Sequence, residues 1–206
     1  RVSSDMLRRM LAFGIPTIFS ILCMRVVDYS DKLLILYLLG DEGASQLGGY
    51  NMAYTPGMVG IMVFVNSFRL AWQPFFMSLK DNPDNRQVFS RVATWYAAFT
   101  GYVLVGITLF REEIFMLYAP KFPVELSAIV PVVSLAYVFF GFYIIMTAGV
   151  FLTEKTRYLP IVSFIAAALN VILNFVFIPT YGVIGAAWTT AISYAAMIGV
   201  MYVISK

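Results

Sequence analysis

Four charged residues occupy a short stretch, Arg25 to Lys32, within an otherwise apolar part of the chain. They are Arg25, Asp28, Asp31 and Lys32, preceded by MLAFGIPTIFSILCM and followed by LLILYLLG. Successive residues of an α-helix are turned by about 100°, so Arg25, Asp28 and Lys32 fall within about 60° of one another. Asp31 lies roughly 60° beyond Asp28 on the same helix. All four therefore share one side of a helix, where they can meet a charged ligand.

A second polar stripe lies in the segment MVFVNSFRLAWQPFF, where Asn66, Arg69 and Gln73 are spaced i, i+3, i+7. This spacing places the three side chains on one helix face. Charged side chains inside a membrane are costly and usually face a helix-bundle interior or a watery cavity. We therefore expect the two stripes to line one aqueous cavity, which makes all seven residues candidates for substrate binding. The alternative for Asp31 and Lys32 is that the helix is longer than the membrane is thick. Both side chains would then lie in water at its outer end.

The composition indicates an integral membrane protein. Hydrophobic residues make up 61% of the 206 residues and charged residues 12%, and the mean hydropathy is +0.82. Soluble domains are closer to half apolar and a quarter charged. The chain has no histidine, which excludes Ser-His-Asp triads and histidine zinc ligands. We expect no catalytic residues, no metal and no cofactor, and we also expect that the protein is not an enzyme.

The apolar residues form six long blocks, each of a length that spans a membrane as a helix. Helix is the expected structure because backbone amides in lipid must be paired within their own segment. The fold class is therefore all-α, a six-helix membrane bundle in one domain over residues 1–206. The expected spans are residues 10–39, 50–79, 92–110, 129–152, 158–178 and 182–204. The chain begins at Arg1, without an initiator methionine, so we expect a segment of a longer protein.

The basic residues outside the blocks favour one orientation. Two of them, Arg111 and Lys121, belong to one set of loops, and nine belong to the opposite set of loops and ends. Lysine and arginine are enriched on the cytoplasmic side of membrane proteins. We therefore expect both ends of the segment in the cytoplasm. The nine residues are Arg1, Arg8, Arg9, Lys80, Arg86, Arg91, Lys155, Arg157 and Lys206.

The last two blocks carry small and weakly polar faces that indicate packing. Asn170 and Asn174 are spaced i, i+4 and share a face with Ser163 and Ala167. Small residues let membrane helices approach closely, and amide side chains can hydrogen-bond across the contact. We predict helix packing at these faces and not a substrate site. A ridge of small residues repeats every four positions in the last block, at Ala187, Ala191, Ala195 and Gly199.

Three segments resemble one family of transporters. LNVILNFVFIPTYGVIGAAWTTAISY has paired asparagines, an Ile-Pro-x-Tyr-Gly turn and a Gly-Ala-Ala helix start. FGIPTIFSILCMRVVDYSDKLLILYLLGDEGASQLGGYNMAY has a proline and the adjacent pair Asp31 and Lys32, and GVFLTEKTRYLPIVSFIAAALNVILN is similar to a helix junction. Together they resemble the polysaccharide exporters, or O-antigen-type flippases, of the multidrug/oligosaccharidyl-lipid/polysaccharide flippase superfamily. The similarity is to the C-terminal six-helix half of a twelve- to fourteen-helix protein.

The resemblance implies a flippase that moves undecaprenyl-diphosphate-linked oligosaccharides across the cytoplasmic membrane by alternating access. Its implied partners are the substrate, the membrane lipid, an N-terminal helical half of the same protein, and a polysaccharide polymerase or glycosyltransferases. The family usually has arginine where this chain has Lys32, which keeps the charge but not bidentate phosphate geometry. Two alternatives remain open: a cation-coupled multidrug antiporter of the same superfamily, with Asp28 or Asp31 carrying the ion, and a non-transporting subunit of a glycan assembly complex.

Overall fold

The fold is all-α, as the sequence predicts. A computed structural model describes residues 4–79, 85–153 and 156–205, and no strand occurs among them. Short 3-10 helices lie at Gly40–Glu42, Val124–Ala128 and Thr156–Tyr158. The α-helices are α1 (Ser4–Leu38), α2 (Gly43–Ser78), α3 (Asn85–Leu109), α4 (Arg111–Tyr118), α5 (Ile129–Leu152) and α6 (Leu159–Ser205).

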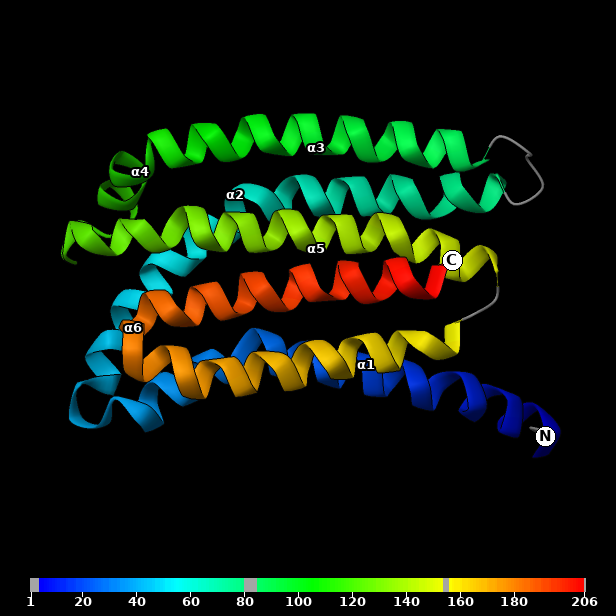
Figure 1. Ribbon diagram of the computed structural model, residues 1–206, viewed down its shortest axis with the longest axis horizontal. Coiled ribbons are helices and arrows are strands. Elements are labelled where there is room, and N and C mark those ends of the chain that lie inside the picture. The colour runs from blue at the N-terminus through cyan, green and yellow to red at the C-terminus, as the bar shows by residue number, and fades with distance from the viewer. Residues whose placement is uncertain (1–3, 80–84, 154–155, 206) are drawn as a thin grey trace.

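Helix α6 contains two segments that run in opposite directions and meet at Gly182 (Figure 1). Gly182 has φ 61° and ψ −148°, a conformation that residues with a Cβ rarely adopt. The two segments correspond to the expected spans 158–178 and 182–204. Helix α5 has the bounds expected for the fourth span, Ile129 to Leu152.

Helix α4 differs from the sequence-based expectation. The segment REEIFMLYAPKFP is too short to span a membrane, so the sequence predicts a loop between the expected spans 92–110 and 129–152. Its first eight residues nevertheless form a helix. Phe115 is fully buried, whereas Leu117 is 89% exposed. The single apolar anchor at Phe115 therefore holds a short helix that hydrophobic block length does not reveal.

The long helices lie side by side, with α3 at one edge and α1 at the other (Figure 1). Helix α1 packs mainly on α6, while α5 packs on α6 and α2. Helix α5 is largely buried, and its buried residues include Val130, Ala136 and Ala148. By contrast, Trp95, Tyr102 and Leu109 of α3 are more than 70% exposed. The core therefore lies along α5, and α3 covers it from outside.

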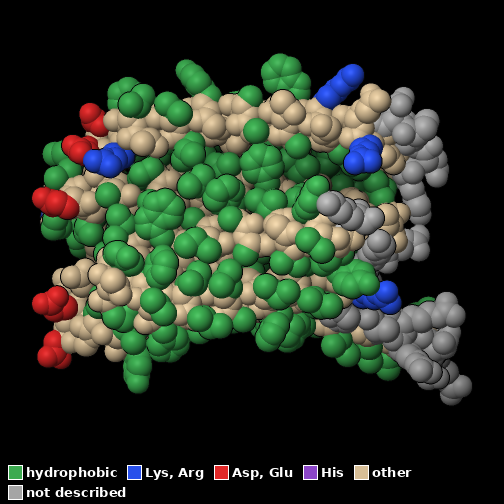
Figure 2. Space-filling model, in the orientation of Figure 1, with side chains coloured by type: hydrophobic (Ala, Val, Ile, Leu, Met, Phe, Trp, Pro, Cys, Tyr) green, Lys and Arg blue, Asp and Glu red, His purple; other side chains and the backbone are tan. Residues whose placement is uncertain are grey.

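The surface fits a membrane protein. Three described helical stretches are long and apolar enough to cross a membrane: Asn85–Leu109, Val124–Leu152 and Leu159–Ile204. The last of these contains the Gly182 turn and so supplies two antiparallel segments. Hydrophobic side chains cover the face of the bundle in Figure 2. Because such a surface is unfavourable in water, the chain is a membrane protein.

Charges of opposite sign gather at opposite ends of the bundle (Figure 2). One end has Arg86 and Arg91 near the start of α3 and Arg157 before α6. Nine basic residues led to the predicted membrane orientation. Four of them lie outside the described residues: Arg1, Lys80, Lys155 and Lys206. We call the end with Arg86, Arg91 and Arg157 the basic end, and the opposite end the acidic end. The acidic end carries five acidic and two basic residues: Asp41, Glu42, Glu112, Glu113, Glu125, Arg111 and Lys121.

Candidate functional site

A cavity of about 760 Å³ lies between α1, α2, α5 and α6. Helices α1 and α2 each contribute a polar stripe, while α5 and α6 contribute aromatic and small polar side chains. Its charged lining residues are Arg25, Asp28, Arg69 and Arg157. The remaining lining residues are Ser20, Ile21, Met24, Met58, Met62, Asn66, Tyr137, Phe140, Tyr143, Ile144, Thr147, Phe151, Leu159, Pro160, Ser163 and Tyr194.

Four of the seven candidate residues line this cavity together: Arg25 and Asp28 from α1, and Asn66 and Arg69 from α2. The i, i+3 spacing puts each pair on one helix face, and the packing of the helices brings both faces to the same cavity. Asn66 and Arg69 are exposed, and so is Arg25. Their polar atoms are therefore accessible to a ligand in the cavity, and their role in substrate binding stays a prediction.

Asp31 and Lys32 lie outside the cavity. Asp31 is fully buried, accepting hydrogen bonds from the Tyr50 hydroxyl and, at 2.7 Å, from the backbone N–H of Lys32. The Lys32 ammonium lies 5.0 Å from the ring centroid of Tyr29 and 4.8 Å from that of Tyr54. The prediction that Asp31 lies in water at a helix end is therefore wrong. The charge of Lys32 is stabilised by cation–π contacts with the two rings.

Gln73 borders a second hollow, on the outer face of α2. This hollow of about 510 Å³ is lined by Arg69, Leu70, Gln73, Pro74 and Met77, all of which are exposed. Arg69 lines both hollows, so the α2 stripe continues from the cavity onto the surface. Gln73 thus lies on the same helix face as Arg69 but beyond the cavity.

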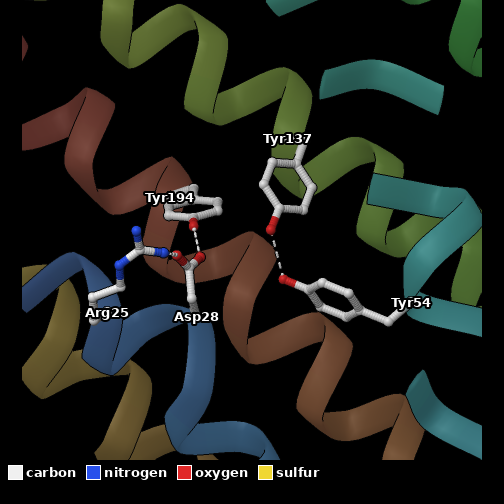
Figure 3. A network of polar contacts seen from close by, with 5 residues as sticks. All are labelled: Arg25, Asp28, Tyr54, Tyr137 and Tyr194. Atoms are coloured by element: carbon white, nitrogen blue, oxygen red, sulfur yellow. Dashed lines mark hydrogen bonds and ion pairs between the residues drawn. The ribbon is translucent and has the colours of Figure 1, made fainter. Parts of the chain in front are cut away.

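Tyrosine hydroxyls make hydrogen bonds at the cavity wall and directly behind it (Figure 3). The Tyr194 hydroxyl donates a hydrogen bond of 2.7 Å to Oδ1 of Asp28, whose Oδ2 lies 3.9 Å from Nη1 of Arg25. The hydroxyls of Tyr54 and Tyr137 lie 2.8 Å apart. Tyr137 and Tyr194 were not among the sequence-based candidates because aromatic residues in apolar blocks resemble core residues. Their signal is that a buried tyrosine hydroxyl needs a hydrogen-bond partner.

Arg157 is a charged lining residue that the helix periodicity does not indicate, because in the sequence it falls among the basic loop residues. It lies in the 3-10 helix Thr156–Tyr158 and is exposed. Its Nη2 donates a hydrogen bond of 3.2 Å to the Tyr158 hydroxyl, and its guanidinium carbon lies 5.1 Å from the ring centroid. The cavity therefore holds three arginines and one aspartate.

The paired asparagines pack α6 against α1. Ser30 donates a hydrogen bond of 2.6 Å to Oδ1 of Asn170, which also accepts one of 2.9 Å from Nδ2 of Asn174. Thr189, after the Gly182 turn, donates one of 2.7 Å to Oδ1 of Asn174. All four side chains are buried, which agrees with the predicted packing role. The small-residue ridge is buried at Ala187 and Ala191, whereas Gly199 is exposed.

Within the described part of the chain, no group of three histidine, cysteine, aspartate or glutamate side chains is placed to hold a metal ion. Hydrogen-bond donors are plentiful instead. The arginines of the cavity bear planar guanidinium groups that match the oxygens of phosphates and carboxylates. The site is therefore suited to non-covalent binding of an anion.

Comparison with known proteins identifies a family that the chain matches. Residues 1–123 fit the model of a family described as polysaccharide biosynthesis protein. No curated protein and no solved structure matches the chain. The matched region contains α1 to α4 and thus the cavity residues Arg25, Asp28, Asn66 and Arg69. Because the match covers more than half of the 206 residues, the chain belongs to the polysaccharide biosynthesis protein family.

Proposed function

We propose that the protein is a flippase that moves undecaprenyl-diphosphate-linked oligosaccharides across the cytoplasmic membrane for cell-surface polysaccharides such as O-antigen. In this proposal it belongs to the exporter branch of the multidrug/oligosaccharidyl-lipid/polysaccharide flippase superfamily. The described bundle is one lobe, the C-terminal half of a twelve- to fourteen-helix transporter, and the other lobe is an N-terminal half of the same protein. Both ends of the described segment face the cytoplasm.

The charge of the cavity is the observation that carries this proposal. Arg25, Arg69 and Arg157 give three positive charges and Asp28 one negative charge, a formal net charge of +2. A diphosphate that links a lipid to a sugar bears two negative charges at neutral pH. Guanidinium groups bind phosphate oxygens in bidentate pairs, and such bonds are stronger than neutral hydrogen bonds. Substrate and cavity therefore carry charges of opposite sign and equal magnitude.

The apolar surfaces fit the remainder of such a substrate. Met24, Met58 and Met62 line the cavity beside the arginines, and methionine side chains adapt to ligands of varied shape. The outer surface of the bundle is apolar and can lie against a lipid tail. Transport of this kind needs no covalent step, only alternate exposure of the cavity to the two sides. In this proposal the protein is a carrier and not an enzyme.

The cation-coupled antiporter is less well supported. A cationic substrate would meet three arginines, and the one aspartate of the cavity is already held by Tyr194 and Arg25. Asp31 is buried behind Tyr50 and does not line the cavity. A non-transporting subunit would have no use for a charged cavity of about 760 Å³ within the membrane.

The test is translocation of the lipid-linked oligosaccharide in cells that lack their own flippase. Arg25→Ala and Arg69→Ala should reach wild-type levels in the membrane, because both side chains are exposed, and should fail to restore export. Arg91→Ala is the matched control, since Arg91 is exposed on α3 outside the cavity. Normal export by Arg25→Ala and Arg69→Ala would contradict the proposal, as would an absence of export with the wild-type protein.

A further inference from the structure

Arg157 lies at one end of the cavity, and the tyrosines Tyr137 and Tyr194 lie at the other end. The deep end is closed by Tyr137 and Tyr194, which are only 5% and 1% exposed. Arg157, Leu159 and Pro160 line the cavity where the chain passes from α5 to α6, at the basic end of the bundle (Figure 1). An anion that comes from this end meets Arg157 before it reaches Arg25 beside Asp28.

The charge of Arg157 is not compensated by an acid within the described residues. Among the described residues its partner is Tyr158, whose hydroxyl accepts one hydrogen bond and whose ring lies against the guanidinium group. Arg25 differs, because it forms an ion pair with Asp28. The stacking on Tyr158 orients Arg157 while most of its five N–H donors remain available. Arg157 is thus oriented and accessible for an anionic ligand.

The start of α6 adds to the positive potential at the same place. Helix α6 begins at Leu159, and both Leu159 and Pro160 line the cavity. The N-terminal end of a helix carries a partial positive charge. Pro160 has no N–H to donate, so this contribution is a field that acts together with the Arg157 side chain.

We propose that Arg157 is the capture residue of the cavity, where the diphosphate headgroup first binds at the basic end before it moves to Arg69 and Arg25. This inference rests on the proposed flippase function. It assigns a binding role to a residue outside the region that matches the family. The cavity then has two functional ends: an accessible arginine that captures the anion, and an arginine paired with Asp28 that receives it.

The experiment measures binding of farnesyl diphosphate to the full-length protein in lipid nanodiscs, at low and at physiological salt. Arg157→Gln should weaken binding about fivefold, which is the effect expected from the loss of one solvent-accessible ion pair. The substitution should also make the binding affinity less dependent on salt. Arg157→Lys should keep much of the affinity because the charge remains. In transport, Arg157→Gln should raise the half-saturating concentration of the lipid-linked oligosaccharide and leave the maximal rate unchanged. Arg86→Gln and Arg91→Gln are controls on the same end but outside the cavity.

The outcomes separate this inference from the function on which it rests. If Arg157→Gln binds as the wild type does, while Arg25→Ala loses binding, Arg157 has no capture role and the flippase proposal stands. Equal weakening by Arg86→Gln and Arg91→Gln would also overturn the inference, because the effect would then come from general surface charge. If the wild-type protein binds no farnesyl diphosphate, both proposals are contradicted.

Discussion

Tyr194 and Asp28 are 166 positions apart in the chain and are joined by a hydrogen bond of 2.7 Å between α6 and α1. Tyr194 is buried, so this bond holds one oxygen of the carboxylate in a fixed place. The other oxygen lies 3.9 Å from Arg25, whose side chain is 64% exposed. Asp28 is therefore the fixed member of the ion pair, and Arg25 is the member free to move toward a ligand.

Tyr194→Phe keeps the ring and removes the donor to Asp28. Since hydrogen bonds to charged groups contribute more than neutral ones, we expect a loss of about 1–2 kcal/mol in stability. Thermal unfolding of the purified protein in detergent measures it. Tyr102→Phe is the control, because Tyr102 is 81% exposed on α3. Equal melting temperatures for Tyr194→Phe and the wild type would show that the bond contributes nothing.

Asn170→Leu should impair folding more than substrate recognition. The substitution leaves Ser30 and Asn174 buried without the acceptor that they share, at about 1–3 kcal/mol for each unsatisfied group. Ala191→Leu should act similarly, by forcing extra volume into a site that is 2% exposed. Membrane abundance and melting temperature report the loss, with Ile172→Leu at a 61% exposed position as control. Variants that reach normal abundance yet lose only transport would contradict the packing role.

Gly57→Ala tests the close contact of α2 with α5. A Cβ at Gly57 would lie 2.5 Å from the Val130 carbonyl oxygen and 3.1 Å from Cβ of Val133. Relief requires the helices to move apart, at about 1–3 kcal/mol, and weakens the bond from Ser134 to the Gly57 carbonyl. Gly106→Ala in α3 meets nothing within 4 Å and should be neutral or slightly stabilising. A lower melting temperature for Gly106→Ala than for Gly57→Ala would refute this assignment.

The orientation can be tested by cysteine labelling in a Cys23→Ala background. Glu42 lies at the acidic end, between α1 and α2, and Asn85 lies at the basic end, at the start of α3, so each reports one side of the membrane. We expect a membrane-impermeant thiol reagent to label Glu42→Cys in intact cells and Asn85→Cys only after permeabilisation. The reverse pattern would place the basic end outside and contradict the proposed cytoplasmic location of both ends.

Helix positions follow from the sequence because length and apolar character are local properties. The bounds of α5 match the expectation, and Asn170 and Asn174 pack as predicted, whereas Ser163 of the same face lines the cavity. Helix α4 depends on the burial of Phe115 against the rest of the bundle, a tertiary effect that block length does not encode. The sequence predicts the two spans joined by Gly182 as separate helices, and the sharp turn at this glycine divides α6 into two antiparallel segments.

The site was predicted only in part because helix geometry fixes faces but not neighbours. Helix periodicity correctly placed Arg25 and Asp28 at the cavity. Asp31 lies about 60° further around α1 and instead accepts a hydrogen bond from Tyr50 of α2. Gln73 is two turns beyond Asn66 and passes the end of the cavity onto the surface. The contributions of Arg157 and Tyr194 depend on how α6 folds back on α1, which no spacing in the sequence specifies.

Asp28→Asn tests whether Asp28 competes with the substrate for Arg25. Asparagine still accepts the hydrogen bond from Tyr194, so the fold should persist, while the formal charge of the cavity rises from +2 to +3. Because Arg25 loses its ion-pair partner, farnesyl diphosphate should bind roughly twofold to fivefold more tightly, and slower release should lower the maximal transport rate. Asp41→Asn, at an exposed position of the acidic end, should change neither quantity. Weaker anion binding by Asp28→Asn, with loss of cation dependence, would instead assign Asp28 to a coupling ion and favour the antiporter.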